Sequence, residues 1–304
     1  MSYIDFNNVT KDYGLGRGLF NVDFHIEKGE SFGIVGINGA GKTTIIRHLM
    51  GFVSPNSGDV KINGFDAFKD AKDIKKLVCY IPGEINFPPL SSGDEFIKQQ
   101  AKFWSVSDLN NVYDIVRDLQ LDTRANLKKM SKGMKQKTAI SVAFLPDNDI
   151  LIFDEPTTGL DPLMRNEFVD IIEKERNKGK TIIMSSHMFD ELEECCDRVA
   201  MIKDGKLLKI VDIKSEIKQN KEKTYKIEFL NLNDYNKFLS KYKIEKHKEI
   251  YLQVVIKVAD KDVNEFISDI VNYDIKFIKE IKPSLEEIFL ELYKKDDNKG
   301  EENV

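Results

Sequence analysis

The stretch "GINGAGKTT", Gly36 to Thr44, is the most informative segment of this chain for its fold class. It follows the apolar run "SFGIVG" and leads into "TTIIRHLM", which has the pattern of a helix. The spacing G-x-x-x-x-G-K-[ST] between a strand and a helix turns backbone N–H groups inward around phosphate oxygens. The positive end of the helix dipole also favours an anion there. The stretch therefore predicts a phosphate-binding loop in which Lys42 reaches the β- and γ-phosphates and Thr43 holds Mg²⁺.

The segment "ILIFDEP" supplies the carboxylates that such a loop needs. Four apolar residues precede Asp154 and Glu155, so both acids come at the end of a buried strand. In an open parallel sheet, ligands bind at that end of the strands. We expect Asp154 to hold Mg²⁺ directly or through water, and Glu155 to orient or deprotonate a water molecule.

The composition sets limits on class and compartment. The chain has 304 residues, which suggests two domains, and a net charge of -5, which disfavours a general nucleic-acid surface. Three cysteines, two of them adjacent at Cys195 and Cys196, give no disulfide framework and fit a reducing cytoplasm. We find no signal-peptide pattern and no run of about 18 apolar residues that would cross a membrane.

The pattern along the chain predicts two domains of different character. Buried apolar strands alternate with helices up to residue 212, which favours a largely parallel α/β core. Alternating strands near the start predict an additional antiparallel sheet, and residues 88–143 predict a helical insertion. The Lys/Glu/Asn-rich segment "DIKSEIKQNKEK" marks a boundary. Residues 213–292 then predict a small α+β domain, and residues 293–304 a disordered tail.

With these motifs in this order, residues 3–210 resemble the nucleotide-binding subunit of an ABC transporter. The resemblance implies an α/β P-loop NTPase fold of the ABC type, a cassette with an antiparallel β subdomain and a helical insertion. It implies ATP hydrolysis with ATP and Mg²⁺ bound. The residues implied to bind the nucleotide are Tyr13, Gly36, Asn38, Gly39, Ala40, Gly41, Lys42, Thr43, Thr44, Ser131, Gly133 and Asp161. The implied catalytic residues are Lys42, Glu155 and His187, and the implied metal ligands are Thr43 and Asp154.

The stretch "MSKGMKQK" resembles the family signature. Ser131 and Gly133 match it, whereas Lys132 replaces the first glycine and Met134 replaces the glutamine. The family uses this helix start to close on the γ-phosphate held by the other subunit, and a small hydroxyl at a helix N-terminus suits an anion. Lys132 either adds charge there or is simply solvated. Asp161 in "TTGLDP" matches the loop that joins the two sites, and it is also a good helix N-cap.

Two further positions are implied by the resemblance. His187 ends "TIIMSSH", where the family histidine contacts the γ-phosphate and helps to hold the attacking water. Tyr13 in "KDYG" is placed to stack on adenine, with a core tyrosine as the alternative.

One loop departs from the family pattern. The segment "CYIPGEINFPP" has Gly83 where the family has a glutamine that ligates Mg²⁺ and contacts the membrane subunit. Glu84 follows, and its carboxylate is also a hard oxygen ligand. Either Glu84 substitutes for the glutamine, or the loop has lost the metal contact and keeps only a hinge. We favour the second interpretation.

The resemblance implies a homodimer with two composite sites, a separate integral-membrane permease, and a cytoplasmic place at the inner face of the cell membrane. The ending "KPSLEEIFLELY" resembles the C-terminal extension of export-type ABC ATPases. The alternatives are a soluble ABC-type ATPase acting on ribosomes or DNA, and a regulator that binds ATP without turnover. Intact Lys42, Asp154, Glu155 and His187 argue against a regulator. The C-terminal domain is regulatory, dimer-stabilising or partner-binding, and we expect no nucleic-acid partner.

Overall fold

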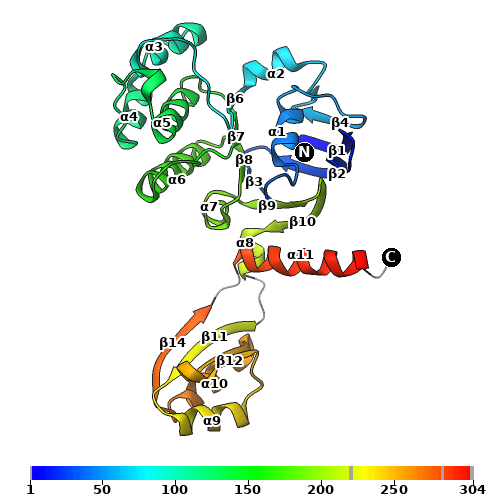
Figure 1. The fold of residues 1–304 in the computed structure, drawn as a ribbon, viewed down its shortest axis with the longest axis vertical. Coiled ribbons are helices and arrows are strands. Elements are labelled where there is room, and N and C mark those ends of the chain that lie inside the picture. Colours follow the sequence, from blue (N-terminus) through cyan, green and yellow to red (C-terminus); the bar gives the residue numbers. More distant parts are fainter. Residues whose placement is uncertain (1, 219–221, 282–283, 302–304) are drawn as a thin grey trace. The chain divides into compact units, whose positions relative to one another are not determined.

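The chain folds into two compact units in the computed structural model, which describes residues 2–218, 222–281 and 284–301. Unit 1 comprises Met1–Ile213 together with Phe289–Val304. Unit 2 comprises Lys214–Ile288. The chain therefore leaves unit 1 once, forms unit 2, and returns to unit 1 near its C-terminus (Figure 1).

A six-stranded sheet forms the core of unit 1 (Figure 1). Its strands are β3 (Ser31–Val35), β6 (Val78–Ile81), β7 (Ile150–Asp154), β8 (Thr181–Ser186), β9 (Arg198–Lys203) and β10 (Lys206–Asp212). They lie in the order β10-β9-β3-β8-β7-β6, with only β10 antiparallel to its neighbour. Every residue of β3, β7 and β8 is buried, as their continuous apolar runs predict for a parallel sheet.

A second, antiparallel sheet confirms the prediction from the alternating strands. It consists of β1 (Ser2–Asp12), β2 (Gly18–Glu27), β4 (Ser57–Ile62) and β5 (Phe65–Asp66), in the order β2-β1-β4-β5. The turn between β4 and β5 uses Asn63 and Gly64 with φ of 50° and 82°, which are the left-handed values that an Asn-Gly hairpin supplies. Helix α1 (Lys42–Leu49) contacts strands of both sheets and buries Ile45 and Ile46 in their shared core.

The predicted helical insertion contains α3 (Gly93–Trp104), α4 (Asn110–Asp118), the short 3₁₀ helix η1 (Leu127–Lys129) and α5 (Lys132–Ala143). Figure 1 shows these helices grouped together beside the strands of unit 1. The predicted apolar stripe of α4 is buried. The Ser92 hydroxyl caps α3 by accepting from Glu95 N, but the Glu95 carboxylate accepts from Ser91 rather than from Ser92.

Unit 1 is completed by α2 (Ala71–Leu77), α6 (Pro162–Asn177), α7 (Phe189–Cys195) and α11 (Leu285–Glu301), the last of which begins in unit 2. We predicted a disordered tail from residue 293, whereas α11 continues to Glu301. A capping box begins this helix, because the Ser284 hydroxyl accepts from Glu287 N and the Glu287 carboxylate accepts from Ser284 N. Buried Phe289 also anchors it. Residues 302–304 lie outside the described part of the chain.

Unit 2 begins with α8 (Ile213–Lys218) and contains a βαββαβ arrangement. Its strands form one antiparallel sheet in the order β12-β13-β11-β14, the order of ferredoxin-like domains. Side chains of β11, β13, α9 and α10, including Tyr225, Ile227, Phe238 and Phe266, form its own core. The elements in chain order are β11 (Glu222–Phe229), α9 (Leu232–Lys241), β12 (Lys246–Lys248), η2 (Glu249–Tyr251), β13 (Gln253–Ala259), η3 (Asp260–Asp262), α10 (Val263–Ile270) and β14 (Ile275–Ile281).

Candidate phosphate-binding and hydrolytic site

The predicted phosphate loop joins β3 to α1 and is held closely by its neighbours. A Cβ atom on Gly36 would lie 2.4 Å from the carbonyl oxygen of Ile202, so only glycine fits there. Gly41, the N-cap of α1, has a φ of 115°, which residues with side chains rarely adopt. Ala40 is buried, and its carbonyl accepts a hydrogen bond of 2.9 Å from Gly205 N. Exposed Asn38 and Gly39 form the tip of the loop.

Lys42 is the first residue of α1, and its ammonium group points back into the loop. Nζ lies 2.8 Å from the carbonyl oxygen of Gly36 and 3.4 Å from Oε1 of Glu155. Its side chain is 6% exposed. A buried cation with a carbonyl and a carboxylate as partners is well placed to exchange one of them for a phosphate oxygen.

Asp154 ends β7 with a buried carboxylate. Its Oδ1 accepts a hydrogen bond of 2.6 Å from the Ser185 hydroxyl and lies 3.4 Å from the Thr43 hydroxyl. The structure thus brings together the two residues that we predicted as metal ligands, although 111 positions separate them in sequence. Both are hard oxygen donors, which is the ligand type that Mg²⁺ prefers, and it usually adds waters and phosphate oxygens to one or two carboxylates. The donor set fits Mg²⁺.

The Glu155 carboxylate contacts the other two predicted catalytic residues, Lys42 and His187. Its Oε1 contacts Lys42, and its Oε2 lies 3.3 Å from Nδ1 of His187. The residue has a φ of 50°, an uncommon value without glycine, and its N–H donates to both the carbonyl and the hydroxyl of Ser185. The Thr158 hydroxyl donates to Oε2 at 3.3 Å. The surroundings therefore hold the strained backbone so that this carboxylate faces both Lys42 and His187.

The signature residues lie at helix N-termini, apart from the phosphate loop. Ser131 caps α5 by accepting from Met134 N, and Asp161 caps α6 by accepting from Met164 N. A Cβ atom on Gly133 would lie 2.7 Å from the carbonyl oxygen of Gly159, so the glycine lets α5 approach the loop before Asp161. Among the described residues, no hydrogen bond or ion pair joins Ser131, Gly133 or Asp161 to the phosphate loop.

Tyr13 is not a core residue. Its side chain is 51% exposed, and Lys11 Nζ lies 5.7 Å from the centre of its ring. An exposed aromatic face of this kind is available for stacking.

Gly83 lies against the predicted metal site. A Cβ atom on it would be 3.5 Å from Oδ2 of Asp154, an ordinary contact, whereas Glu84 beside it is exposed. Nearby Tyr80 has its pKa raised to about 12, first by burial and then by the charge of Asp154. The neighbouring Phe87 is half-buried, with its ring 4.8 Å from that of Phe96.

Sequence reasoning missed the supports behind the catalytic residues. Ser185 holds both Asp154 and Glu155, and the only sequence signal was a pair of serines at the end of an apolar strand. Behind them, the Ser186 hydroxyl donates to buried Glu191 at 2.5 Å, and Thr157 bonds the same carboxyl. Burial is the largest influence on Glu191 and raises its pKa.

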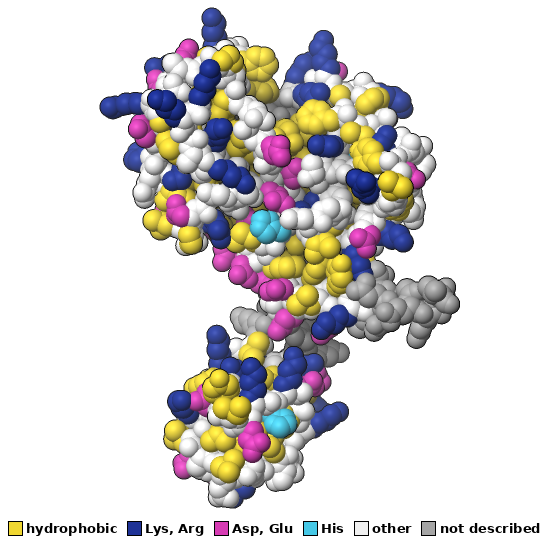
Figure 2. All heavy atoms as spheres, viewed as in Figure 1, with side chains coloured by type: hydrophobic (Ala, Val, Ile, Leu, Met, Phe, Trp, Pro, Cys, Tyr) yellow, Lys and Arg dark blue, Asp and Glu magenta, His cyan; other side chains and the backbone are white. Residues whose placement is uncertain are grey.

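On one face of the molecule, acidic side chains gather beside an exposed histidine (Figure 2).

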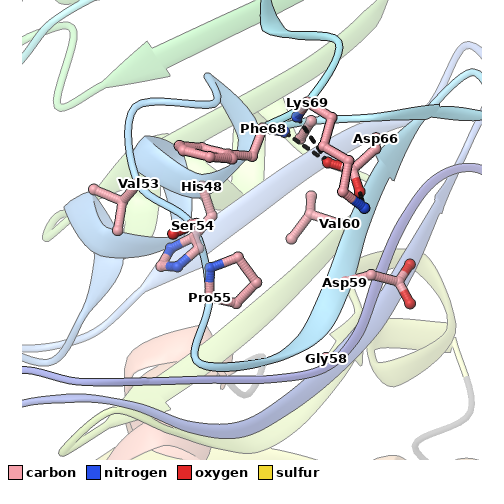
Figure 3. Close-up of a pocket in the computed structure, with 11 residues that line it drawn as sticks. His48, Val53, Ser54, Pro55, Gly58, Asp59, Val60, Asp66, Phe68 and Lys69 are labelled. Atoms are coloured by element: carbon pink, nitrogen blue, oxygen red, sulfur yellow. Dashed lines mark hydrogen bonds and ion pairs between the residues drawn. The ribbon is translucent and has the colours of Figure 1, made fainter.

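A separate pocket of about 230 Å³ lies between α1, β4 and the segment after β5 (Figure 3). Its walls include Val53, Pro55 and Phe68, and none of the predicted site residues lines it. Buried His48 forms part of it, with Nδ1 2.7 Å from the Thr44 carbonyl within α1. Burial lowers the pKa of His48, which favours the neutral form of the imidazole.

Known proteins resemble both the sequence and the fold. The ABC transporter family matches residues 19–158. The uncharacterized ABC transporter ATP-binding protein YhcH of Bacillus subtilis (strain 168) is 34% identical over 301 residues, 95% of each chain. The bacitracin transport ATP-binding protein BcrA of Bacillus licheniformis is 34% identical over 249 residues, 80% of this chain and 79% of that one. A solved ATP-binding subunit of an ABC transporter superimposes with a TM-score of 0.65 at 26% identity, over 72% of this chain and 93% of that one.

Proposed function

Because this chain belongs to the ABC transporter family and is an ATPase of that family, we propose that its ATP hydrolysis drives a separate membrane permease in export. The observation that carries the proposal is the Glu155 carboxylate, which lies 3.4 Å from Lys42 and 3.3 Å from His187. A carboxylate that can orient a water molecule, beside a lysine that can neutralise phosphate charge, is an arrangement that phosphoryl transfer to water uses.

The phosphate loop and Lys42 hold the triphosphate. The loop amides and the N-terminus of α1 face its negative charge, and Lys42 neutralises charge that develops on the transferred phosphoryl group. Exposed Tyr13 stacks on the adenine ring. Thr43 and Asp154 would hold Mg²⁺, which supplies additional positive charge to the β- and γ-phosphate oxygens when bound.

Glu155 acts on the attacking water. Its carboxylate orients the water and accepts its proton as the oxygen bonds to the γ-phosphorus and the bond to the β–γ bridging oxygen breaks. His187 contacts the same carboxylate and steadies the water and the γ-phosphate. Ser185 fixes the backbone of Glu155 and the carboxylate of Asp154, so both acids keep their places.

Two copies complete each other's sites. Ser131 and Asp161 are exposed at the starts of α5 and α6, where a helix N-terminus attracts an anion. In a homodimer these helix starts close on the γ-phosphate held by the other copy. ATP binds the closed dimer better than the open one, so it shifts that equilibrium, and hydrolysis releases it.

The coupling partner is a membrane protein. In the part of the chain that the structure describes, no helix has both the length and the apolar character needed to span a bilayer. The relative from Bacillus licheniformis is named for bacitracin transport, and two thirds or more of this chain also aligns with Nod factor export proteins. We propose attachment to the inner face of the cell membrane through an export permease.

The test is a co-purification. Tagged Glu155→Gln protein, which we expect to bind ATP and arrest as a closed dimer, is isolated with ATP from gently solubilised native membranes. A Lys42→Ala variant is the matched control, since loss of the ammonium group should weaken its hold on ATP. A multi-span membrane protein recovered in near-equal amount with Glu155→Gln supports the proposal. Recovery of ribosomes or DNA, or of no partner with all ATPase outside the membrane fraction, contradicts it.

A further inference from the structure

Helix α11 packs next to the segment that carries His187. From Phe289 onward this helix belongs to unit 1. The ring centre of Phe289 lies 5.3 Å from that of Phe189, and Phe289 itself is 4% exposed. Phe189 is the first residue of α7 and comes two positions after His187. The aromatic pair therefore fixes the start of α7 close to the histidine.

Helix α11 also contacts the end of strand β9, the strand whose Ile202 carbonyl abuts Gly36 of the phosphate loop. Lys203 Nζ lies 3.9 Å from the centre of the Tyr293 ring and 3.4 Å from the Tyr293 carbonyl oxygen. Lys203 ends β9, directly after Ile202, whose carbonyl abuts Gly36. One helix thus contacts both the residue two positions after His187 and the residue that follows Ile202, the neighbour of Gly36.

The orientation of His187 depends on its backbone. Its side chain is 52% exposed, and its Nδ1 lies 3.3 Å from Oε2 of Glu155. On one side the chain is fixed by β8, where Ser186 bonds the Met188 N–H at 3.0 Å. On the other side it is fixed by α7, through Phe189 and its contact with Phe289. The Phe189–Phe289 contact is the anchor nearest to His187 on this side, and Glu191 farther along α7 adds a second one by accepting from the Ser186 hydroxyl. Removal of the aromatic contact loosens the start of α7, where the histidine loop ends.

We propose that Phe289 is a positioning residue for ATP hydrolysis, which acts through Phe189 to hold the imidazole of His187 against Glu155. The proposal rests on the catalytic role of His187 given above.

The experiment is a double-mutant cycle on full-length protein, with kcat and KM for ATP measured in each variant. We expect Phe289→Ala to lower kcat about tenfold with KM within about twofold, because a displaced catalytic group weakens turnover more than ground-state binding. Phe289→Leu, which keeps an apolar side chain against Phe189, should restore most of the rate. Leu290→Ala is the matched control, since Leu290 is the next residue of α11 and is 47% exposed.

The decisive comparison is in the His187→Ala background. There Phe289→Ala should cause no further loss of kcat, because the group that it positions is gone. An equal loss in both backgrounds, or no loss in either, overturns the role of Phe289. A His187→Ala variant with wild-type kcat would instead refute the catalytic role of His187. If Phe289→Ala is not folded by circular dichroism, Phe189→Leu takes its place in the same cycle, with the same criteria.

Discussion

We predict that the Glu155 carboxylate, although it serves hydrolysis, weakens the binding of ADP because it competes with the β-phosphate for Lys42. In this structure Lys42 Nζ lies 2.8 Å from the Gly36 carbonyl oxygen, 3.5 Å from the Ile37 carbonyl oxygen and 3.4 Å from Glu155 Oε1, its one carboxylate partner among the described residues. A β-phosphate must compete with Glu155 for this ammonium group. Glu155→Gln keeps the shape of the side chain and removes the competing charge, so we expect the variant to bind Mg-ADP more tightly than the wild type.

The size of the effect follows from burial. The Lys42 side chain is 6% exposed and that of Glu155 is 26% exposed, so the pair lies between a surface pair and a buried one. Exposed pairs contribute about 0.2–1 kcal/mol, and partial burial places this one near the upper end, at about 1 kcal/mol. Since 1.4 kcal/mol corresponds to about tenfold in Kd, we expect binding to tighten about fivefold.

Isothermal titration with Mg-ADP measures the effect without turnover. Glu173→Gln is the matched control, because Glu173 is exposed on α6 and its replacement makes the same change in net charge. In a Lys42→Met background, Glu155→Gln should no longer tighten binding if competition for the ammonium is the cause. Unchanged or weaker binding in the single variant, or full tightening in the Lys42→Met background, would refute the reasoning.

Two further predictions concern burial and close packing. Burial raises the pKa of Glu191 above its ordinary 4.5, so folded protein holds this proton to a higher pH than unfolded chain does. Wild-type stability should therefore fall relative to Glu191→Gln as pH rises from 4.5 through the raised pKa. Urea unfolding of both proteins over this range measures the change, and a wild-type free energy of unfolding that stays constant or rises relative to that of the variant would contradict it. Gly36→Ala should weaken ATP binding at least about tenfold, because its Cβ would lie 2.4 Å from Ile202 O; unchanged Kd by titration argues against that close approach.

The features formed by residues close together in the chain could be predicted from the sequence. The phosphate loop, the strand-end acids Asp154 and Glu155, and the turn at Asn63-Gly64 depend on backbone preferences and hydrophobic runs within a few residues. The same holds for the capping role of Asp161. Such features need no knowledge of distant segments, because the residues that form them are neighbours in the chain.

Only the tertiary structure placed the partners of these residues. Parallel pairing of β7 with β8 brings Ser185 to Asp154 across 31 positions, and no local pattern encodes that hydrogen bond. The ferredoxin-like order of unit 2 depends on β14 pairing with β11, which are far apart in the chain. Likewise, the tail looked disordered by composition, but α11 extends to Glu301, and Phe289 buries its ring against Phe189. Sequence determined which groups this protein carries, whereas long-range packing decided which of them meet, because contact between distant segments is set by the fold as a whole.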